Sequence, residues 1–224
     1  MNPERIRANV AVTLVGAGRV DPAQLRRALL VAPRLLAADG GAHRAWACGM
    51  LPEAVIGDLD SLGPQAPWRA RGVAIHHIPE QESTDFAKCL ALVEAPLYLA
   101  LGFAGDRLDH LLAALSVLAG VPERRVILLG DGDLCFLAPL TLALDLPEGM
   151  RVSLWPVAPT RVVEAQGLVW PARGLLLEPA GRIGTSNAAR SGPVRLRFDR
   201  RGVFVILPAA ALAAAIGAFS IPVD

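Results

Sequence analysis

Lysine, cysteine and tyrosine are scarce in this 224-residue chain, which has three cysteines, one tyrosine and Lys88 as its only lysine. The cysteines form no Cys-x-x-Cys pair, so they suit neither a disulfide framework nor a structural zinc site, and we expect a reducing, cytoplasmic location. Charged residues make up only 19%, and 22 basic residues scattered among 21 acidic ones leave a net charge of +1. This balance argues against a polybasic arm for nucleic acids or membrane surfaces.

Hydrophobic residues, by contrast, make up 53% of the chain, which is enough for a sizeable core and excludes wholesale disorder. One uncharged run, residues 203–223, has the length of a membrane span. Pro208 divides it into a β-rich VFVIL and an alanine-rich segment, and alanine contributes little to membrane insertion. We therefore expect a strand followed by a terminal helix, and no membrane span.

The pattern of apolar runs differs between the first and second parts of the chain. Up to about residue 137, short β-rich runs alternate with helical patterns, which predicts an α/β domain with a mostly parallel, Rossmann-like sheet over residues 1–139. Later runs are short and are broken by Gly and Pro at intervals of roughly ten residues, the spacing of a β-sandwich or a β-barrel. An all-β domain is therefore expected over residues 140–224.

Aspartates are concentrated in one part of the chain, because six of the twelve fall between Asp39 and Asp109. In the segment IGDLDSL, after a predicted strand, an extended chain would point Asp58 and Asp60 the same way and Leu59 into the core. Two converging carboxylates could hold a hard cation such as Mg²⁺. Alternatively, Asp and Ser after a strand are ordinary turn and N-cap residues.

The segment QESTDFAK predicts a helix capped by Ser83 or Thr84 and running to about Glu94. Asp85 falls in its first turn, and Lys88 lies three residues later on the same face. The pair could bind metal and phosphate, or it could only stabilise the helix. The use of the only lysine at this position favours the functional interpretation.

The segment GFAGDRLDH predicts a glycine-bearing loop between a strand and an apolar helix. Backbone N–H groups there, together with the helix N-terminus, favour phosphate, and Arg107 adds a bidentate donor. Asp109 could complete an acidic cluster or cap the helix. His110 could be a hydrogen-bonded wall residue or an acid or base.

Three weaker signals remain. Asp39 begins a strand-end loop with two glycines, which is compatible with a ligand contact or a tight turn. Ser186 and Asn187 form a small polar cluster that could bind substrate or form a plain turn. GAG at residues 16–18 starts like a dinucleotide fingerprint, but Asp21 stands where its third glycine belongs, and the chain has no P-loop motif.

Taken together, ADGGAHRA, PEAVIGDLDSL, QESTDFAKCLAL, GFAGDRLDH, GLVWPA and GTSN resemble the thiamine pyrophosphokinase family in type, order and spacing. The resemblance covers residues 10–207. It implies an α/β domain that binds ATP, a β-sandwich that binds thiamine, and a homodimer. It also implies a Mg²⁺-dependent reaction in which thiamine and ATP give thiamine diphosphate and AMP.

The resemblance also implies residue roles. Asp58, Asp60 and Asp85 would hold Mg²⁺, Lys88 and Arg107 would neutralise phosphate charge, and Asp109 would support the acidic cluster or accept the hydroxyl proton. The residues expected to be catalytic are Asp58, Asp60, Asp85, Lys88, Arg107 and Asp109. Those expected to contact substrates are Asp39, Gln81, Thr84, His110, Ser186 and Asn187. The last two would hold the thiamine pyrimidine across a dimer interface.

The chain departs from the family pattern at three positions. His43 and Ala114 each stand where asparagine is usual or frequent, and Asp106 replaces a glycine, which would repel anions unless it faces away or recruits a metal. Some members place an aromatic residue near the C-terminus against thiamine. Trp170 could substitute for it, although we expect Trp170 to pack in the core.

Two other functions stay compatible with the sequence. The same acidic cluster could serve a different Mg²⁺-dependent phosphotransferase or phosphohydrolase. A catalytically weak homologue could instead bind thiamine or a nucleotide as a sensor.

Overall fold

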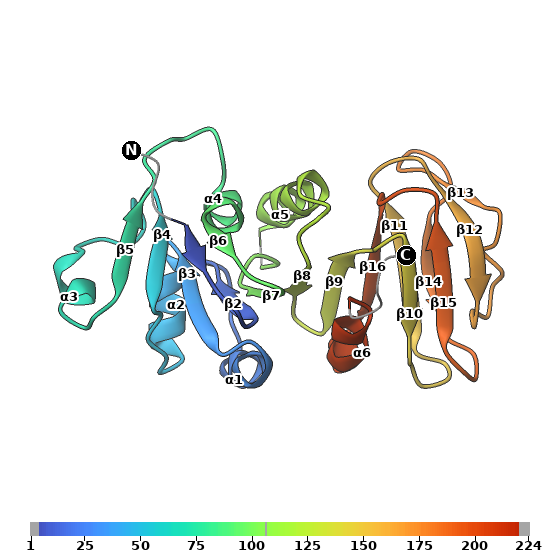
Figure 1. Cartoon of the computed structure of the whole chain (residues 1–224), viewed down its shortest axis with the longest axis horizontal. Helices are drawn as coiled ribbons and strands as arrows, with labels where there is room; N and C mark the ends of the chain where they lie inside the picture. The colour runs from blue at the N-terminus through green and yellow to red at the C-terminus, as the bar shows by residue number, and fades with distance from the viewer. Residues whose placement is uncertain (1–4, 106, 220–224) are drawn as a thin grey trace. The chain divides into compact units, whose positions relative to one another are not determined.

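The computed structural model describes residues 5–105 and 107–219 (Figure 1). The chain divides into two compact units, the first comprising residues up to 117 together with 128–130, and the second comprising 118–127 together with the residues from 131 onward. Asp106, expected to repel anions before Arg107, lies outside the described residues. The two units are built from different kinds of strand pairing.

In the first unit, parallel strands pair in the order β7, β2, β3, β4 and β5. Their bounds are Tyr98–Leu101, Val12–Val15, Arg34–Ala38, Ala54–Gly57 and Ala74–His77. Every residue of β2, β4 and β7 is buried, as is typical of parallel strands covered on both faces. A further parallel pair joins β1 (Ile6–Arg7) to β6 (Val93–Glu94).

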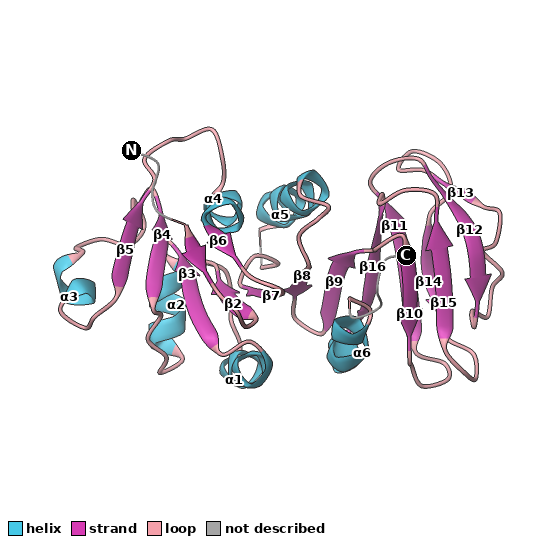
Figure 2. Ribbon diagram, in the orientation of Figure 1, coloured by secondary structure: helices cyan, strands magenta, loops and turns pink. Residues whose placement is uncertain are grey.

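The helices of this unit follow the strands along the chain. They are α1 (Pro22–Val31), α2 (Gly41–Ala47), α3 (Ala66–Arg69), α4 (Asp85–Leu92) and α5 (Leu108–Gly120), the last of which continues into the second unit. Figure 2 shows α1 and α2 on one side of the parallel strands and α4 on the other. The helix expected to reach Glu94 ends at Leu92, because Val93 takes an extended conformation and begins β6.

Strand order reverses at β2 in the first unit. From β2 the chain adds β3, β4 and β5 on one side, and it then returns through α4 to place β7 on the other side of β2. In open α/β sheets, ligands bind at the carboxyl ends of the strands beside such a switch point. A ligand site is therefore expected at the loops after β2 and β7.

The second unit is antiparallel. One set of strands pairs in the order β14, β11, β16 and β9, with bounds Gly184–Ala188, Arg151–Pro156, Val203–Pro208 and Asp133–Leu137. A second set pairs in the order β10, β15, β12 and β13, with bounds Thr141–Leu144, Val194–Phe198, Thr160–Gln166 and Leu176–Leu177. Strand β8 (Val126–Leu129) lies where the chain passes between the units.

The uncharged run near the C-terminus forms the strand and helix expected from its sequence. Strand β16 is followed by the 3₁₀ turn η1 (Ala209–Ala211) and by α6 (Leu212–Gly217). Among the residues that the structure describes, no helix is long and apolar enough to cross a membrane.

Candidate active site

A cavity of about 330 Å³ opens at the carboxyl ends of the parallel strands. Its walls come from the loops after β2, β3, β4 and β7, from Gln81, Ser83 and Thr84, from the first turn of α4 and from the first two turns of α5. It therefore lies at the point where the strand order reverses, and all its lining residues belong to the first unit.

Three carboxylates lie close together at this end of the sheet, and two of them, Asp39 and Asp58, line the cavity. Each of Asp39, Asp58 and Asp60 offers an oxygen, and these oxygens lie within 4.8 Å of one another. Asp39 is only 2% exposed; its Oδ2 accepts a hydrogen bond from the Ser61 N–H at 3.0 Å, and its Oδ1 has no hydrogen-bond partner among the described residues. A buried carboxylate oxygen without a donor is costly unless an ion completes it. The donor set and this unpartnered oxygen fit a hard divalent cation such as Mg²⁺.

The turn that carries Asp58 and Asp60 is not the extended chain that the sequence suggested. Strand β4 ends at Gly57, and Leu59 has a φ of +69°, in the left-handed region that a branched side chain rarely adopts. The Asp60 N–H donates to Asp58 Oδ1 at 3.2 Å, which closes a local turn. Leu59 still points into the core, where it packs in a buried cluster with Leu62. Burial of Leu59 and the local hydrogen bond together hold a strained turn, and strain of this kind is concentrated at functional sites.

Lys88 is buried, with its side chain 2% exposed. Its Nζ lies 3.4 Å from Asp58 Oδ2 and 3.2 Å from Asp85 Oδ1. Burial alone would lower the pKa of Lys88, but the hydrogen bond and charge of Asp85 outweigh it and raise that pKa. Lys88 is therefore a charged ammonium that holds two carboxylates, and it is not among the side chains that line the cavity.

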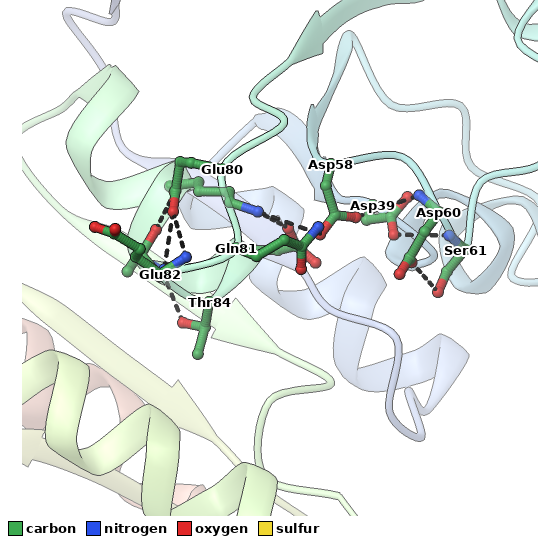
Figure 3. Close-up of polar contacts among 12 residues, drawn as sticks. Asp39, Asp58, Asp60, Ser61, Glu80, Gln81, Glu82 and Thr84 are labelled. Atoms are coloured by element: carbon green, nitrogen blue, oxygen red, sulfur yellow. Dashed lines mark hydrogen bonds and ion pairs between the residues drawn. The ribbon is translucent and has the colours of Figure 1, made fainter.

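The carboxylates around the cavity differ in how readily they ionise. Burial would raise the pKa of Asp58, but hydrogen bonds from the Asp60 N–H and the Gln81 amide, together with Lys88, lower it. Burial raises the pKa of Asp85, and it raises that of Asp39 to about 6. The Gln81 Nε2 donates to Asp58 Oδ2 at 2.9 Å, and Figure 3 shows the two side chains pointing toward each other.

The loop before α4 is held by Glu80, which the sequence analysis missed. Its carboxylate accepts hydrogen bonds from the N–H of Glu82 at 2.8 Å and of Ser83 at 3.0 Å, and from the Ser83 hydroxyl (Figure 3). Thr84 caps α4, since its hydroxyl accepts from the Ala87 N–H at 3.2 Å, as the capping pattern predicted. A carboxylate three residues before a serine was the signal that could have identified Glu80.

Two glycines allow the loops around the cavity to approach closely. A Cβ at Gly57 would lie 2.9 Å from both Asp39 Cβ and Asp85 Oδ1, so no side chain fits where the carboxylates converge. A Cβ at Gly16 would lie 2.7 Å from the Gly102 carbonyl oxygen. Gly16 and Ala17 of the GAG segment thus line the cavity, although the segment lacks the dinucleotide fingerprint.

Of the three site residues expected around the start of α5, one lines the cavity and two lie on the surface. His110 lines the cavity. Arg107 and Asp109 are paired with each other, with Nη2 to Oδ2 at 2.6 Å and Nε to Oδ1 at 3.2 Å. Their side chains are 67% and 66% exposed, and neither lines the cavity. Of the atypical residues, Ala114 lines the cavity and His43 does not.

In the second unit, the side chain of Asn187 forms hydrogen bonds to backbone groups. Its Oδ1 accepts from the N–H of Trp170 at 3.1 Å and of Ala188 at 2.8 Å, and its Nδ2 donates to the Trp170 carbonyl at 2.9 Å. The expectation that Trp170 packs in the core is wrong, because Trp170 is 58% exposed. Ser186 has a φ of +61° and donates its N–H to the Ser153 hydroxyl at 3.0 Å. Asn187 therefore holds an exposed tryptophan in place beside a strained serine.

Comparison with known proteins places this site in a family. Residues 25–128 match the family model described as "Thiamin pyrophosphokinase, catalytic domain". Thiamine pyrophosphokinase 3 of Oryza sativa subsp. japonica is 30% identical over 200 residues, which covers 71% of this chain and 74% of the relative. The chain belongs to the thiamine pyrophosphokinase family. Another relative, thiamine pyrophosphokinase 1 of Arabidopsis thaliana, is 27% identical over 197 residues, which covers 73% of this chain and 74% of that protein.

Solved structures of the family share its fold. The thiamin pyrophosphokinase from Candida albicans superposes with a TM-score of 0.77 at 16% identity, covering 92% of this chain and 93% of the other. The yeast thiamin pyrophosphokinase has a TM-score of 0.76 at 19% identity, covering 92% of each chain. The thiamine pyrophosphokinase fold thus extends over both units of this chain.

Proposed function

We propose that this chain transfers a pyrophosphoryl group from ATP to the hydroxyethyl oxygen of thiamine, giving thiamine diphosphate and AMP. Membership of the thiamine pyrophosphokinase family supports this activity. The observation that carries it is the group of Asp39, Asp58 and Asp60, the first two of which line a cavity at the strand-order switch point, where nucleotides bind in open α/β sheets.

Mg²⁺ is the cation that this group would hold. Asp58 and Asp60, with the unpartnered oxygen of Asp39, offer the hard oxygen ligands that it prefers. When bound, Mg²⁺ would neutralise and align phosphate oxygens. We also assign Asp85 to the metal site; its carboxylate and that of Asp58 both pair with Lys88.

The protein's own groups preorganise this cavity. Lys88 lowers the repulsion among the carboxylates, and Gln81 fixes the orientation of Asp58, so the site does not have to reorganise when the triphosphate arrives. Arg107 is an exposed cation just before α5, and we assign it to the phosphates of ATP. Before ATP binds, Asp109 orients the Arg107 guanidinium. His110 forms part of the wall against which a substrate would be aligned.

The two parts of the chain would divide the substrates between them. We assign ATP to a Rossmann-like domain over residues 1–139 and thiamine to a β-sandwich over residues 140–224. The strained Ser186 and the tryptophan held by Asn187 support a binding surface in the second part.

We also infer a cytoplasmic homodimer. Leu108 and Leu112, one turn apart on α5, are 69% and 51% exposed, as expected of an apolar face that a second copy covers. The free cysteines are compatible with a reducing compartment.

Product analysis tests the proposed reaction. The protein is incubated with thiamine, ATP and Mg²⁺, and the nucleotides are separated; AMP and thiamine diphosphate should appear in equal amounts, and Asp58→Asn should produce neither. Formation of ADP would instead show a phosphotransferase and overturn the proposal. Thiamine binding by calorimetry without turnover would show a sensor.

A further inference from the structure

A second cavity, of about 250 Å³, lies in the first unit between α2, α3 and the loop that follows the Asp58–Asp60 turn. His43 and Trp46 of α2 form one wall, Trp68 of α3 and Leu62 form another, and Arg71 lies at the edge. None of these side chains lines the acidic cavity. The proposed reaction therefore leaves this cavity without a role.

Three rings give the cavity its shape. His43 meets Trp68 edge-to-face, with ring centroids 5.3 Å apart and planes at 71°, and Trp46 meets it with centroids 6.3 Å apart and planes at 83°. Trp68 is buried, whereas Trp46 remains 49% exposed. The three rings contact one another, and the exposed part of Trp46 is a surface on which a flat heteroaromatic group can stack.

The charge of the cavity selects an anion. The Arg71 guanidinium carbon lies 5.0 Å from the Trp46 ring centroid, and its Nη1 donates to the Pro67 carbonyl at 2.7 Å. No carboxylate is among the lining residues that the structure describes. The remaining guanidinium donors suit phosphate, and the unopposed positive charge disfavours a cationic ligand such as thiamine.

His43 adds a hydrogen-bonding preference. Its Nε2 lies 2.9 Å from the Leu62 carbonyl oxygen, and because a carbonyl can only accept, Nε2 carries the hydrogen. In the neutral imidazole, Nδ1 is then an acceptor, and no described residue donates to it. His43 lines the cavity, and an acceptor on its ring matches an amino group on a flat ligand.

We propose that this cavity binds an adenine nucleotide, with the base stacked on the exposed part of the Trp46 ring, its amino group toward His43 Nδ1 and its phosphate at Arg71. The hydrogen bond from His43 to Leu62 connects the cavity to the loop whose Ser61 N–H bonds to Asp39. Since AMP is a product of the proposed reaction, its concentration would act on the acidic cavity through this loop; this consequence rests on the proposed function.

Tryptophan fluorescence tests the binding without turnover. AMP is titrated into the full chain in EDTA, where the metal site cannot hold nucleotide phosphates, and saturable quenching is expected. Trp46→Ala should weaken AMP binding at least about tenfold. Arg71→Ala should weaken AMP binding about fivefold and leave adenosine binding unchanged. The matched control Arg69→Ala, whose guanidinium bonds to Gln65 outside the cavity, should bind AMP as the wild type does.

The outcomes separate the two proposals. Asp58→Asn should bind AMP in EDTA as tightly as the wild type does. If it does not, or if Trp46→Ala and Arg71→Ala both bind AMP normally, the nucleotide lies elsewhere and this proposal is overturned. Absence of saturable quenching overturns it as well. A protein that binds AMP here but makes no AMP from thiamine and ATP would overturn the proposed function alone.

Discussion

Two sets of ion pairs in the first unit, that of Lys88 and that of Arg107, join a cation to carboxylates in opposite environments. Lys88 holds Asp58 and Asp85 with its side chain 2% exposed, whereas Arg107 holds Asp109 with both side chains about two-thirds exposed. Removing one partner from a buried pair leaves an uncompensated charge, which is strongly destabilising, while exposed pairs contribute little. The buried pair is therefore part of the architecture of the site, and the exposed pair can exchange its partner for a phosphate.

Breaking the buried pair should have the largest effect. Lys88→Ala should lower the free energy of unfolding by about 3 kcal/mol, because two carboxylates lose their counter-charge. Urea unfolding followed by circular dichroism measures it, with Arg107→Ala as the matched control that leaves the unfolding midpoint unchanged. A midpoint shift equal in the two variants would contradict the difference between the pairs.

Crowding the carboxylates of Asp39 and Asp85 should have the second largest effect. Gly57→Ala should lower kcat/KM about a hundredfold, because the added Cβ would overlap Asp39 and Asp85 and displace both. Steady-state kinetics measures it. Gly120→Ala, at the end of α5 where a Cβ meets nothing within 4 Å, should keep full activity. Normal activity in Gly57→Ala would mean that the carboxylates need not converge.

Neutralising the unpartnered carboxylate of Asp39 should weaken the stabilisation that a bound cation provides. Mg²⁺ at about a hundred times its Kd should stabilise the wild type by about 2.7 kcal/mol and raise its Tm. Asp39→Asn keeps the acceptor for the Ser61 N–H but loses a charged ligand, so its Tm should respond weakly to Mg²⁺. Thermal melts with and without Mg²⁺ decide it, and an equal response in both proteins would exclude Asp39 from the metal site.

Breaking the exposed pair should have the smallest effect, and only on activity. Arg107→Ala should lower kcat/KM for ATP about tenfold while leaving Tm unchanged, because the guanidinium acts on phosphate and not on the fold. Asp109→Ala should lower kcat/KM less than Arg107→Ala does. The opposite order would show that Asp109 itself takes part in the chemistry.

Local features were predictable from the sequence where the physics is local. The apolar runs of β2, β4 and β7, the Thr84 cap and the pairing of Asp85 with Lys88 three residues later all follow from periodicity or capping. The family resemblance followed from the order of the motifs and was confirmed by the relatives.

Features that depend on distant contacts were not predictable. The strained φ of Leu59 requires a core to bury its side chain, and the bonds that hold the Trp170 backbone come from Asn187, 17 residues later on β14. The cavity around His43 forms only when α2 and α3 lie side by side. The sequence marked His43 only as atypical for the family, and the structure shows that it lines this cavity and contacts Trp68.

By itself, the sequence determined that half of the aspartates fall between Asp39 and Asp109, in segments that follow predicted strands, and that the only lysine shares a helix face with Asp85, because strand and helix periodicities are local features of the sequence. Only the tertiary structure decided which of these charges share one site. Parallel pairing of β3 and β4 brings Asp39 beside Asp58, and packing of α4 buries Lys88 against both Asp58 and Asp85. Convergence of this kind depends on strand order and burial, neither of which has a local signal.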